Sequence, residues 1–326
     1  MKTEILRMLR EKDGYVSGQQ LCEELGVSRT AVWKVINQLK EEGYQIEAVR
    51  NKGYHIAEVP DLLSKDEVQS LTGTRWAGTN VVYYEETDST NIRAKALAEE
   101  GAGHGTLVIA DRQNAGKGRR GRGWVSPKGE NIYMSILLRP EFEPAKAPML
   151  TLVMAYSVTQ ALRMREEINA KIKWPNDIVL HKKKICGILT EMSAEIDYIN
   201  HVVIGVGINT NMDHIEEELA DKATSLRIEE GRKIRRAELI AEVMERFEAN
   251  YERFVIDGNL SGIKEKYNEM LVNQDRDVRV LEPGNEYDAH ALGINETGEL
   301  LVRKEDGTVD AVFAGEVSVR GIYGYV

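Results

Sequence analysis

The hydrophobic period changes twice along this 326-residue chain, and these changes predict three structural units. In residues 1–60, apolar residues recur at helical spacing and then alternate as they do in strands. Strand-like and helix-like segments mix from about 65 to 270, and short strands separated by turns follow. We therefore expect an α+β multidomain protein with units at 1–62, 63–271 and 272–326. Strand candidates in the central unit are 81–84, 107–110, 132–138, 184–189 and 202–208, and helix candidates are 90–100, 147–167 and 235–254.

The first unit has the pattern of a winged helix-turn-helix. Ser17 and Ser28 each stand where a serine caps a helix, and Gly26 can end the first of the two helices. Two strand-like segments, 43–49 and 53–56, follow as a wing. In this geometry the second helix enters the major groove of DNA; the alternative is a module that docks a protein. Candidate DNA-contacting residues are Arg29, Thr30, Trp33, Lys34, Asn37, Arg50 and Lys52.

Charge and composition exclude several classes of protein. The chain has 43 basic and 53 acidic residues, whereas residues 1–60 contain nine of each, so the rest is acidic. Nucleic-acid contact is therefore expected only locally. The longest stretch without a charged residue, 147–162, is shorter than the ~20 apolar residues that a bilayer requires. With two cysteines and no apolar signal segment, we expect a cytoplasmic protein without a membrane span.

A segment rich in glycine and basic residues is the strongest chemical signal. Between Arg112 and Gly123 there are five basic side chains, four glycines and no acidic residue, and Trp124 follows. Glycines allow the backbone to approach a ligand closely, and guanidinium groups match phosphate or carboxylate oxygens. The segment predicts a small-anion loop; the alternative is a solvated arginine–glycine linker or a nucleic-acid contact.

Two further segments are compatible with ordinary structural roles. Lys184 enters an apolar strand, so its ammonium is expected to point at a specific group, while Lys182 and Lys183 suit an exposed hairpin tip and Trp174 suits a core. Asp88 or Ser89 can simply cap the following helix. The chain has no phosphate-binding loop of the form GxxxxGK[ST] and no complete dinucleotide fingerprint. Its six histidines lack metal-ligand spacing, so no metal site is expected.

Taken in order, five segments resemble the corresponding segments of biotin–protein ligases: 88–91, Gln113 with 116–124, 173–177, Lys184 with 187–189, and 205–209. With the helix-turn-helix, the chain is similar to the bifunctional bacterial form that also represses the biotin operon. Lys117 departs from the arginine common in that family. The resemblance implies an N-terminal winged helix, a central mixed sheet shared with lipoate ligases and class II synthetases, and a C-terminal SH3-like β-barrel.

The resemblance also implies a two-step reaction and its site. Biotin and ATP, accompanied by Mg²⁺, give biotinyl-5′-AMP and pyrophosphate, and a lysine of a biotin carboxyl carrier protein then displaces AMP. Lys184 is expected to bridge the carboxylate and phosphate oxygens, and Asp177 to accept the proton of the incoming amine. Residues expected to bind biotin or the adenylate are Ser89, Thr90, Asn91, Gln113, Gly116, Lys117, Gly118, Arg119, Arg120, Arg122, Trp124, Asn176, Gly187 and Asn209.

As a repressor of this kind, the chain is expected to use biotinyl-5′-AMP as corepressor, to form a homodimer when the adenylate is bound, and to bind operator DNA of biotin genes. Two other functions remain open at this stage. One is a transcription factor that senses a small anionic ligand without turning it over. The other is a lipoate or octanoate ligase. Lys184 with the full glycine–arginine loop argues against a mere sensor, and the DNA-binding unit argues against a lipoate ligase.

Overall fold

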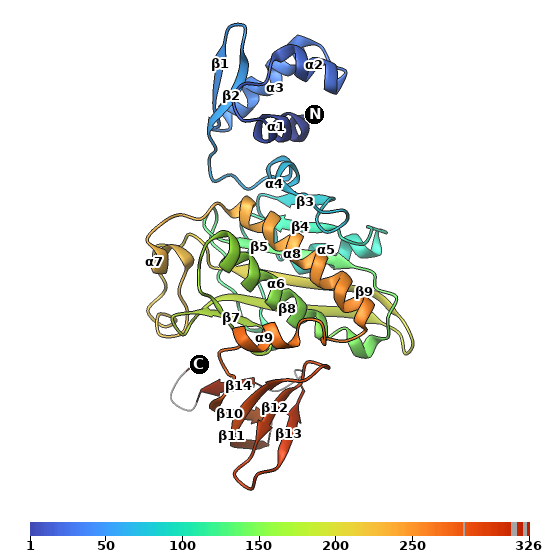
Figure 1. Cartoon of the computed structure of the whole chain (residues 1–326), viewed down its shortest axis with the longest axis vertical. Helices are drawn as coiled ribbons and strands as arrows, with labels where there is room; N and C mark the ends of the chain where they lie inside the picture. The colour runs from blue at the N-terminus through green and yellow to red at the C-terminus, as the bar shows by residue number, and fades with distance from the viewer. Residues whose placement is uncertain (283, 314–317, 322–324) are drawn as a thin grey trace.

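The structure is a computed structural model that describes residues 1–282, 284–313, 318–321 and 325–326. Figure 1 shows three units stacked along the long axis: helices with a two-stranded wing at one end, a large sheet in the middle and a smaller sheet at the other end. The predicted α+β architecture is confirmed.

The N-terminal unit is a winged helix-turn-helix, called the head below. Its elements are α1 (Lys2–Glu11), α2 (Gly18–Leu25), α3 (Arg29–Glu41), β1 (Gln45–Val49) and β2 (Gly53–Glu58). The hydroxyls of Ser17 and Ser28 accept hydrogen bonds from the backbone amides three residues on, at 3.0 and 3.2 Å. Gly26 takes the left-handed φ of 65° that ends α2. The apolar faces of the helices meet in a core separate from the rest of the chain.

Helix α4 (Lys65–Leu71) connects the head to the central unit. On one side it packs against α1, where Arg10 forms an ion pair with Glu67 at 2.5 Å. Tyr44 of the head also donates a hydrogen bond to Glu67, whose side chain is buried. On its other side α4 packs against α8. The head therefore contacts the body through a short helix with a buried carboxylate.

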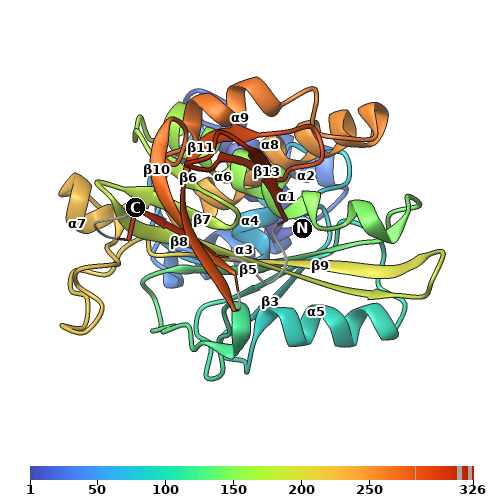
Figure 2. The same ribbon diagram turned by 90° about the horizontal axis from the view of Figure 1, so that it is seen from below.

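A seven-stranded mixed sheet forms the central unit, in the order β3-β4-β5-β9-β8-β7-β6. Only β3 and β4 pair in parallel. Figure 2 shows α5 on one face of this sheet and α6 with α8 on the other. The elements are β3 (Val81–Tyr84), α5 (Thr90–Glu99), β4 (Leu107–Ala110), β5 (Ile132–Leu138), α6 (Met149–Arg165), β6 (Lys171–Lys173), β7 (Asp177–Leu180), β8 (Lys183–Ala194), β9 (Ile199–Ile208), α7 (Leu226–Glu230), α8 (Arg236–Asp257) and α9 (Lys264–Met270).

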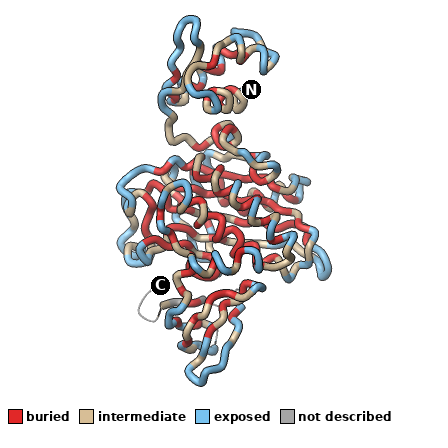
Figure 3. Tube along the Cα trace, viewed as in Figure 1, coloured by how far each residue is buried: buried red, intermediate tan, exposed pale blue. Residues whose placement is uncertain are grey.

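The C-terminal unit is an antiparallel sheet in the order β13-β12-β11-β10-β14. Its strands are β10 (Arg276–Glu282), β11 (Asn285–Ile294), β12 (Leu300–Arg303), β13 (Val309–Val312) and β14 (Ser318–Gly321). Val280 and Ala291 belong to the same apolar cluster as the central sheet, and Figure 3 shows buried chain in both units. Trp174 is buried and donates from Nε1 to the Gly298 carbonyl at 3.0 Å. The interpretation of Trp174 as a core aromatic is therefore right.

Candidate active site

Two adjoining cavities lie beside β8 and β9. The smaller, of about 50 Å³, is bounded by the start of α5, Gln113, and the glycine-containing parts of both strands. The larger, of about 270 Å³, lies between the glycine–arginine loop and residues 212–223. The same residues line both cavities where they meet: Gly118, Arg119, Trp124, Asn176 and Lys184. The two cavities therefore form the two lobes of one site.

Polar groups at the start of α5 line the small cavity. The Gln113 side chain accepts a hydrogen bond from the Thr90 amide at 2.8 Å and donates to the Ser126 hydroxyl at 3.1 Å. Ser89 occupies the N-cap position of α5, but its hydroxyl makes no capping hydrogen bond. The carboxylate of Asp88 accepts the Ser89 amide instead, at 2.6 Å. Capping therefore does not account for the Ser89 hydroxyl, which faces a cavity lined by donors and acceptors.

Asn91 is held against the sheet below this cavity. Its amide nitrogen donates to Glu191 at 2.7 Å, and its oxygen lies 2.6 Å from the hydroxyl of the buried Ser135. A Cβ atom on Gly205 would lie 2.1 Å from that oxygen. Asn91 therefore fits only over a glycine. Ser135 and Glu191 were missed from the sequence because β5 and the outer half of β8 carry no motif.

The indole of Trp124 rests on a glycine pair. Gly187 of β8 is opposite Gly207 of β9. A Cβ atom on Gly207 would lie 2.7 Å from the indole, and one on Gly187 would lie 3.0 Å from it. The Lys184 ammonium is 5.2 Å from the ring centroid, and the buried indole Nε1 has no hydrogen-bond partner among the described residues. The two glycines thus allow a flat ring to lie directly on the sheet.

The large cavity is strongly cationic. Six basic side chains line it against two acidic ones, Asp177 and Glu216. Arg119 donates from Nη1 to the Asn176 side chain at 3.0 Å, and both residues face the two cavities. Burial lowers the pKa of Arg119, although nearby Asp177 partly counteracts this effect. Because partly buried cations require compensating negative charge, this lobe suits a polyanion. The basic residues are Arg119, Arg120, Arg122, Lys173, Lys184 and Lys222.

Lys184 and Asp177 form an ion pair at the junction of the two lobes. The ammonium lies 2.6 Å from Asp177 Oδ1, and the two side chains are 24% and 14% exposed. Asp177 begins β7, and Lys184 lies in β8, which pairs with β7. Lys182 at the tip of this hairpin is exposed, as predicted. The Lys184 ammonium therefore lines both lobes, and a carboxylate of the neighbouring strand holds it in place.

The far wall of the large cavity was missed from the sequence. It includes Met212, Ile215 and Leu219, which lie among acidic residues without a helical or strand period. Tyr325 also lines this cavity: its hydroxyl donates to Asp177, and the Lys173 ammonium lies 3.7 Å from its ring centroid. A sequence signal for these residues is weak, because isolated apolar residues in a polar segment are usually surface residues.

The structure brings nearly all the predicted binding residues together. Gly116 lines neither cavity, and a Cβ atom there would lie 2.7 Å from the Trp124 carbonyl oxygen. Asn209 faces the large cavity and donates to the Thr224 carbonyl at 3.0 Å. Residues lining one or both cavities are Ser89, Thr90, Asn91, Gln113, Lys117, Gly118, Arg119, Arg120, Arg122, Trp124, Asn176, Asp177, Lys184, Gly187 and Asn209.

The predicted DNA-contacting residues lie on α3 and on the wing of the head. Arg29, Thr30, Trp33 and Lys34 are exposed on α3, and Asn37 is partly exposed. A groove joins the start of α3 to the wing and is lined by Arg29, Arg50 and Lys52.

In the part of the chain that the structure describes, no group of three or more histidine, cysteine or carboxylate residues could hold a metal ion. None of the described helices is long and apolar enough to cross a membrane.

Comparison with known proteins gives matches in all three units of the chain. Residues 83–209 match the Biotin/lipoate A/B protein ligase family, residues 2–55 match an HTH domain, and residues 275–320 match the Biotin protein ligase C terminal domain. The chain is 39% identical to the bifunctional ligase/repressor BirA of Bacillus subtilis over 94% of each protein. It is 33% identical to BirA of Escherichia coli over 93% of this chain and 92% of the relative.

A solved structure shows the same likeness. Biotin protein ligase from Aquifex aeolicus, in complex with biotin and ATP, has a TM-score of 0.66 and 34% identity, and the match covers 74% of this chain and 99% of that one. Fold and site together define an acid-activating ligase joined to a helix-turn-helix head. The chain belongs to the family of bifunctional ligase/repressor biotin protein ligases.

Proposed function

We propose that this chain is an ATP-dependent biotin–protein ligase and a transcriptional repressor of biotin biosynthesis genes. It activates biotin to biotinyl-5′-AMP and transfers the biotinyl group to a lysine of a biotin carboxyl carrier protein. The observation that supports this function best is the position of Lys184, whose ammonium lies where the polar small cavity meets the cationic large cavity. Biotin then occupies the small lobe and the nucleotide the large one. The three assigned units are 1–62 for DNA, 63–271 for catalysis and 272–326 for the C-terminal sheet.

Charge at the junction provides the chemical rationale. A biotin carboxylate oxygen attacks the α-phosphorus of ATP, and pyrophosphate leaves. Because two anions must approach each other, an ammonium between them stabilises the transition state. Lys184 serves this role, and Arg119, Arg120 and Arg122 surround the nucleotide phosphates. Ser89, Thr90 and Gln113 hydrogen-bond the ureido ring, where an unpaired buried group would cost ~1–3 kcal/mol.

Magnesium fits this site as a companion of ATP. Mg²⁺ is usually held by substrate phosphates with one or two carboxylates, and Asp177 and Glu216 are the carboxylates of the cavity lining. When bound, the ion would shield the phosphate charge.

The proposed partners are a carrier protein, which accepts the biotinyl group, and operator DNA, which the head binds. In the second step the acceptor lysine amine attacks the carbonyl of the mixed anhydride, AMP leaves, and Asp177 accepts the proton.

With nine basic and nine acidic residues in 1–60, a single head has modest attraction for DNA. We propose a homodimer of the adenylate-bound protein, since two heads can engage two half-sites of operator DNA.

The acid that is activated tests this function directly. The purified chain should form an acyl-adenylate from ATP and biotin, but not from ATP and lipoate or octanoate, as measured by acid-dependent pyrophosphate exchange. Turnover of lipoate would favour the lipoate ligase. Binding of biotin without exchange would favour a sensor that does not turn its ligand over.

Arg119 should retain the adenylate rather than react with it. Arg119→Gly removes a guanidinium from the junction of both cavities, so the intermediate should escape and label a non-cognate protein about 10-fold more than the wild type does, as expected when a hydrogen bond to a charged group is lost. Labelling of serum albumin with biotin measures this escape. Arg112→Gly is the matched control, because Arg112 is exposed and pairs with Glu86 at the surface. Unchanged albumin labelling with weaker acceptor labelling would contradict a retaining role.

Asp177→Asn should slow transfer more than activation. The amide keeps the size of the side chain but is too weak a base to accept the amine proton. We expect transfer to the carrier protein to fall about 10-fold or more relative to adenylate formation. Single-turnover transfer from preformed adenylate measures the second step, and Asp197→Asn in an exposed position serves as control. Equal slowing of both steps would assign Asp177 to the positioning of Lys184 or Mg²⁺ instead.

A further inference from the structure

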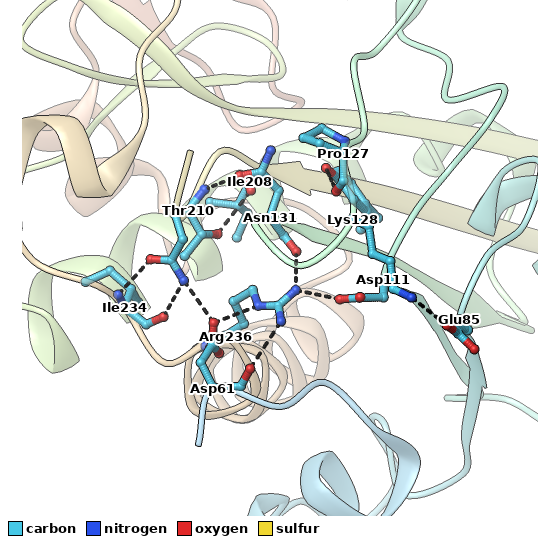
Figure 4. Close-up of polar contacts among 12 residues, drawn as sticks. Asp61, Glu85, Asp111, Pro127, Lys128, Asn131, Ile208, Thr210, Ile234 and Arg236 are labelled. Carbon is cyan, nitrogen blue, oxygen red and sulfur yellow. Dashed lines mark hydrogen bonds and ion pairs between the residues drawn. The ribbon is translucent and has the colours of Figure 1, made fainter. Parts of the chain in front are cut away.

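Arg236, the first residue of α8, lies at a buried polar junction outside both cavities. Its side chain is only 3% exposed. The guanidinium donates from Nη1 to Asp111 at 2.7 Å and from Nε to Asp61 at 3.0 Å, and the Arg236 amide donates to the other Asp61 oxygen at 3.1 Å. Figure 4 shows this cluster, with Arg236 between the two carboxylates. Arg236 is thus bound to two segments that are far apart in the sequence.

Each of the two carboxylates lies where one part of the chain joins the next. Asp61 lies between β2 of the head and α4. Asp111 directly follows β4 and precedes the glycine–arginine loop. Burial alone lowers the pKa of Arg236, but Asp61 and Asp111 outweigh this effect and raise it. The guanidinium and both carboxylates therefore depend on one another for charge compensation.

The connection between β4 and β5, which carries the glycine–arginine loop, ends at the same junction. Asn131 directly precedes β5, and its backbone carbonyl accepts from Arg236 Nη1 at 3.3 Å. Its side-chain oxygen accepts the Thr210 amide at 2.8 Å. Asn131 is fully buried. Both ends of the β4–β5 connection that carries the glycine–arginine loop therefore contact one arginine.

The wall of the large cavity begins at this junction too. Asn211 follows β9 and is succeeded by the wall residues that start at Met212. Its amide nitrogen donates to Asp61 Oδ2 at 3.1 Å and to the Ile234 carbonyl at 2.8 Å, and its amide oxygen accepts from the Ile234 amide at 2.9 Å. Asp61 thus contacts the base of the cavity wall as well as Arg236.

We propose that Arg236 is a positioning residue for adenylate formation, and that through Asp61 it couples the two ligand-enclosing segments to the head. This inference rests on the proposed function. Ordering of residues 112–124 and 212–223 around a ligand fixes Asp111, Asn131 and Asn211, and these hold Arg236 and Asp61 in place. The segment that leads to the head is then ordered by a ligand that it does not touch. Coupling of this kind is reciprocal.

Two variants separate the two halves of the proposal. Arg236→Lys keeps the charge but loses the fork that reaches Asp61 and Asp111 together. We expect KM for biotin and for ATP to rise about 10-fold with kcat within about twofold, because binding is weakened while the reacting groups are intact. Arg235→Lys is the matched control, since Arg235 is an exposed neighbour that pairs with Glu238 on the surface. An unchanged KM in Arg236→Lys would refute the positioning role.

Hydrogen–deuterium exchange of the full chain, with and without saturating biotin and ATP, tests the coupling. In the wild type, ligand should protect 111–131, 210–225 and also 58–71, the segment that joins the head. Asp61→Ala leaves Arg236 paired with Asp111, so the first two segments should still be protected, whereas protection of 58–71 should be lost. Ligand protection of 58–71 that survives in Asp61→Ala, or is absent from the wild type, would overturn the coupling. Biotin-dependent pyrophosphate exchange in each variant reports separately on the proposed function.

Discussion

Replacing Lys184 by glutamine is expected to reduce the rate of biotinyl-adenylate formation by about 1,000-fold, the upper range for loss of one preorganised electrostatic group. The ammonium lies at the junction of the two cavities and 2.6 Å from Asp177. Glutamine preserves polarity and most of the length of the side chain but has no charge to place between a carboxylate and a phosphate. Biotin-dependent pyrophosphate exchange measures the loss.

The same hairpin supplies the control. Lys182 is two residues away, is exposed and has no place in either cavity. Lys182→Gln should retain full exchange activity. A Lys184→Gln protein that keeps its fold, as judged by circular dichroism, and loses less than about 10-fold would show that the ammonium does not stabilise the reacting anions.

Gly207→Ala is expected to raise the Kd for biotin by about 10- to 100-fold, since overpacking a close contact costs ~1–3 kcal/mol. The added methyl would lie 2.7 Å from the Trp124 indole, which is a rigid ring rather than the end of a flexible side chain. The indole must then move into the space that biotin needs. Isothermal titration calorimetry with biotin measures this dissociation constant.

Gly103→Ala is the control for this substitution. A Cβ atom on Gly103 meets nothing within 4 Å, so this substitution shows the effect of replacing a glycine where no close contact is created. Biotin affinity should be unchanged in Gly103→Ala. Wild-type affinity in Gly207→Ala would mean that Trp124 does not lie on this strand when biotin binds.

Much of the fold could be predicted because the segments concerned have a clear period or a local signal. The strands at 107–110 and 132–138 are buried runs, the strand at 81–84 is an apolar run, and all three occur at the predicted residues. The helix expected at 235–254 is observed at Arg236–Asp257. Strand β8 is longer than the predicted 184–189, because its second half carries Thr190, Glu191 and Ser193, and their polarity obscures a strand that pairs with β9.

The site was predictable only where several unusual residues occur in a short segment. The glycine–arginine loop and Lys184 met this condition, and the structure places them together. Ser135, Tyr325 and the wall at 212–223 did not, since they are ordinary residues without a motif and reach the site only through tertiary packing. Arg236 was missed for the same reason: its two carboxylate partners are 175 and 125 residues away in the chain.

The central claim is that one ammonium and a cationic loop enclose an activated acyl-nucleotide, and a crystal structure with a non-hydrolysable biotinyl-adenylate analogue tests it most directly. We predict biotin in the small cavity, the nucleotide in the large cavity, Lys184 within hydrogen-bond distance of the linkage between them, and residues 116–124 closed over it. An analogue bound elsewhere, with the loop turned away from an empty cavity, would contradict the account.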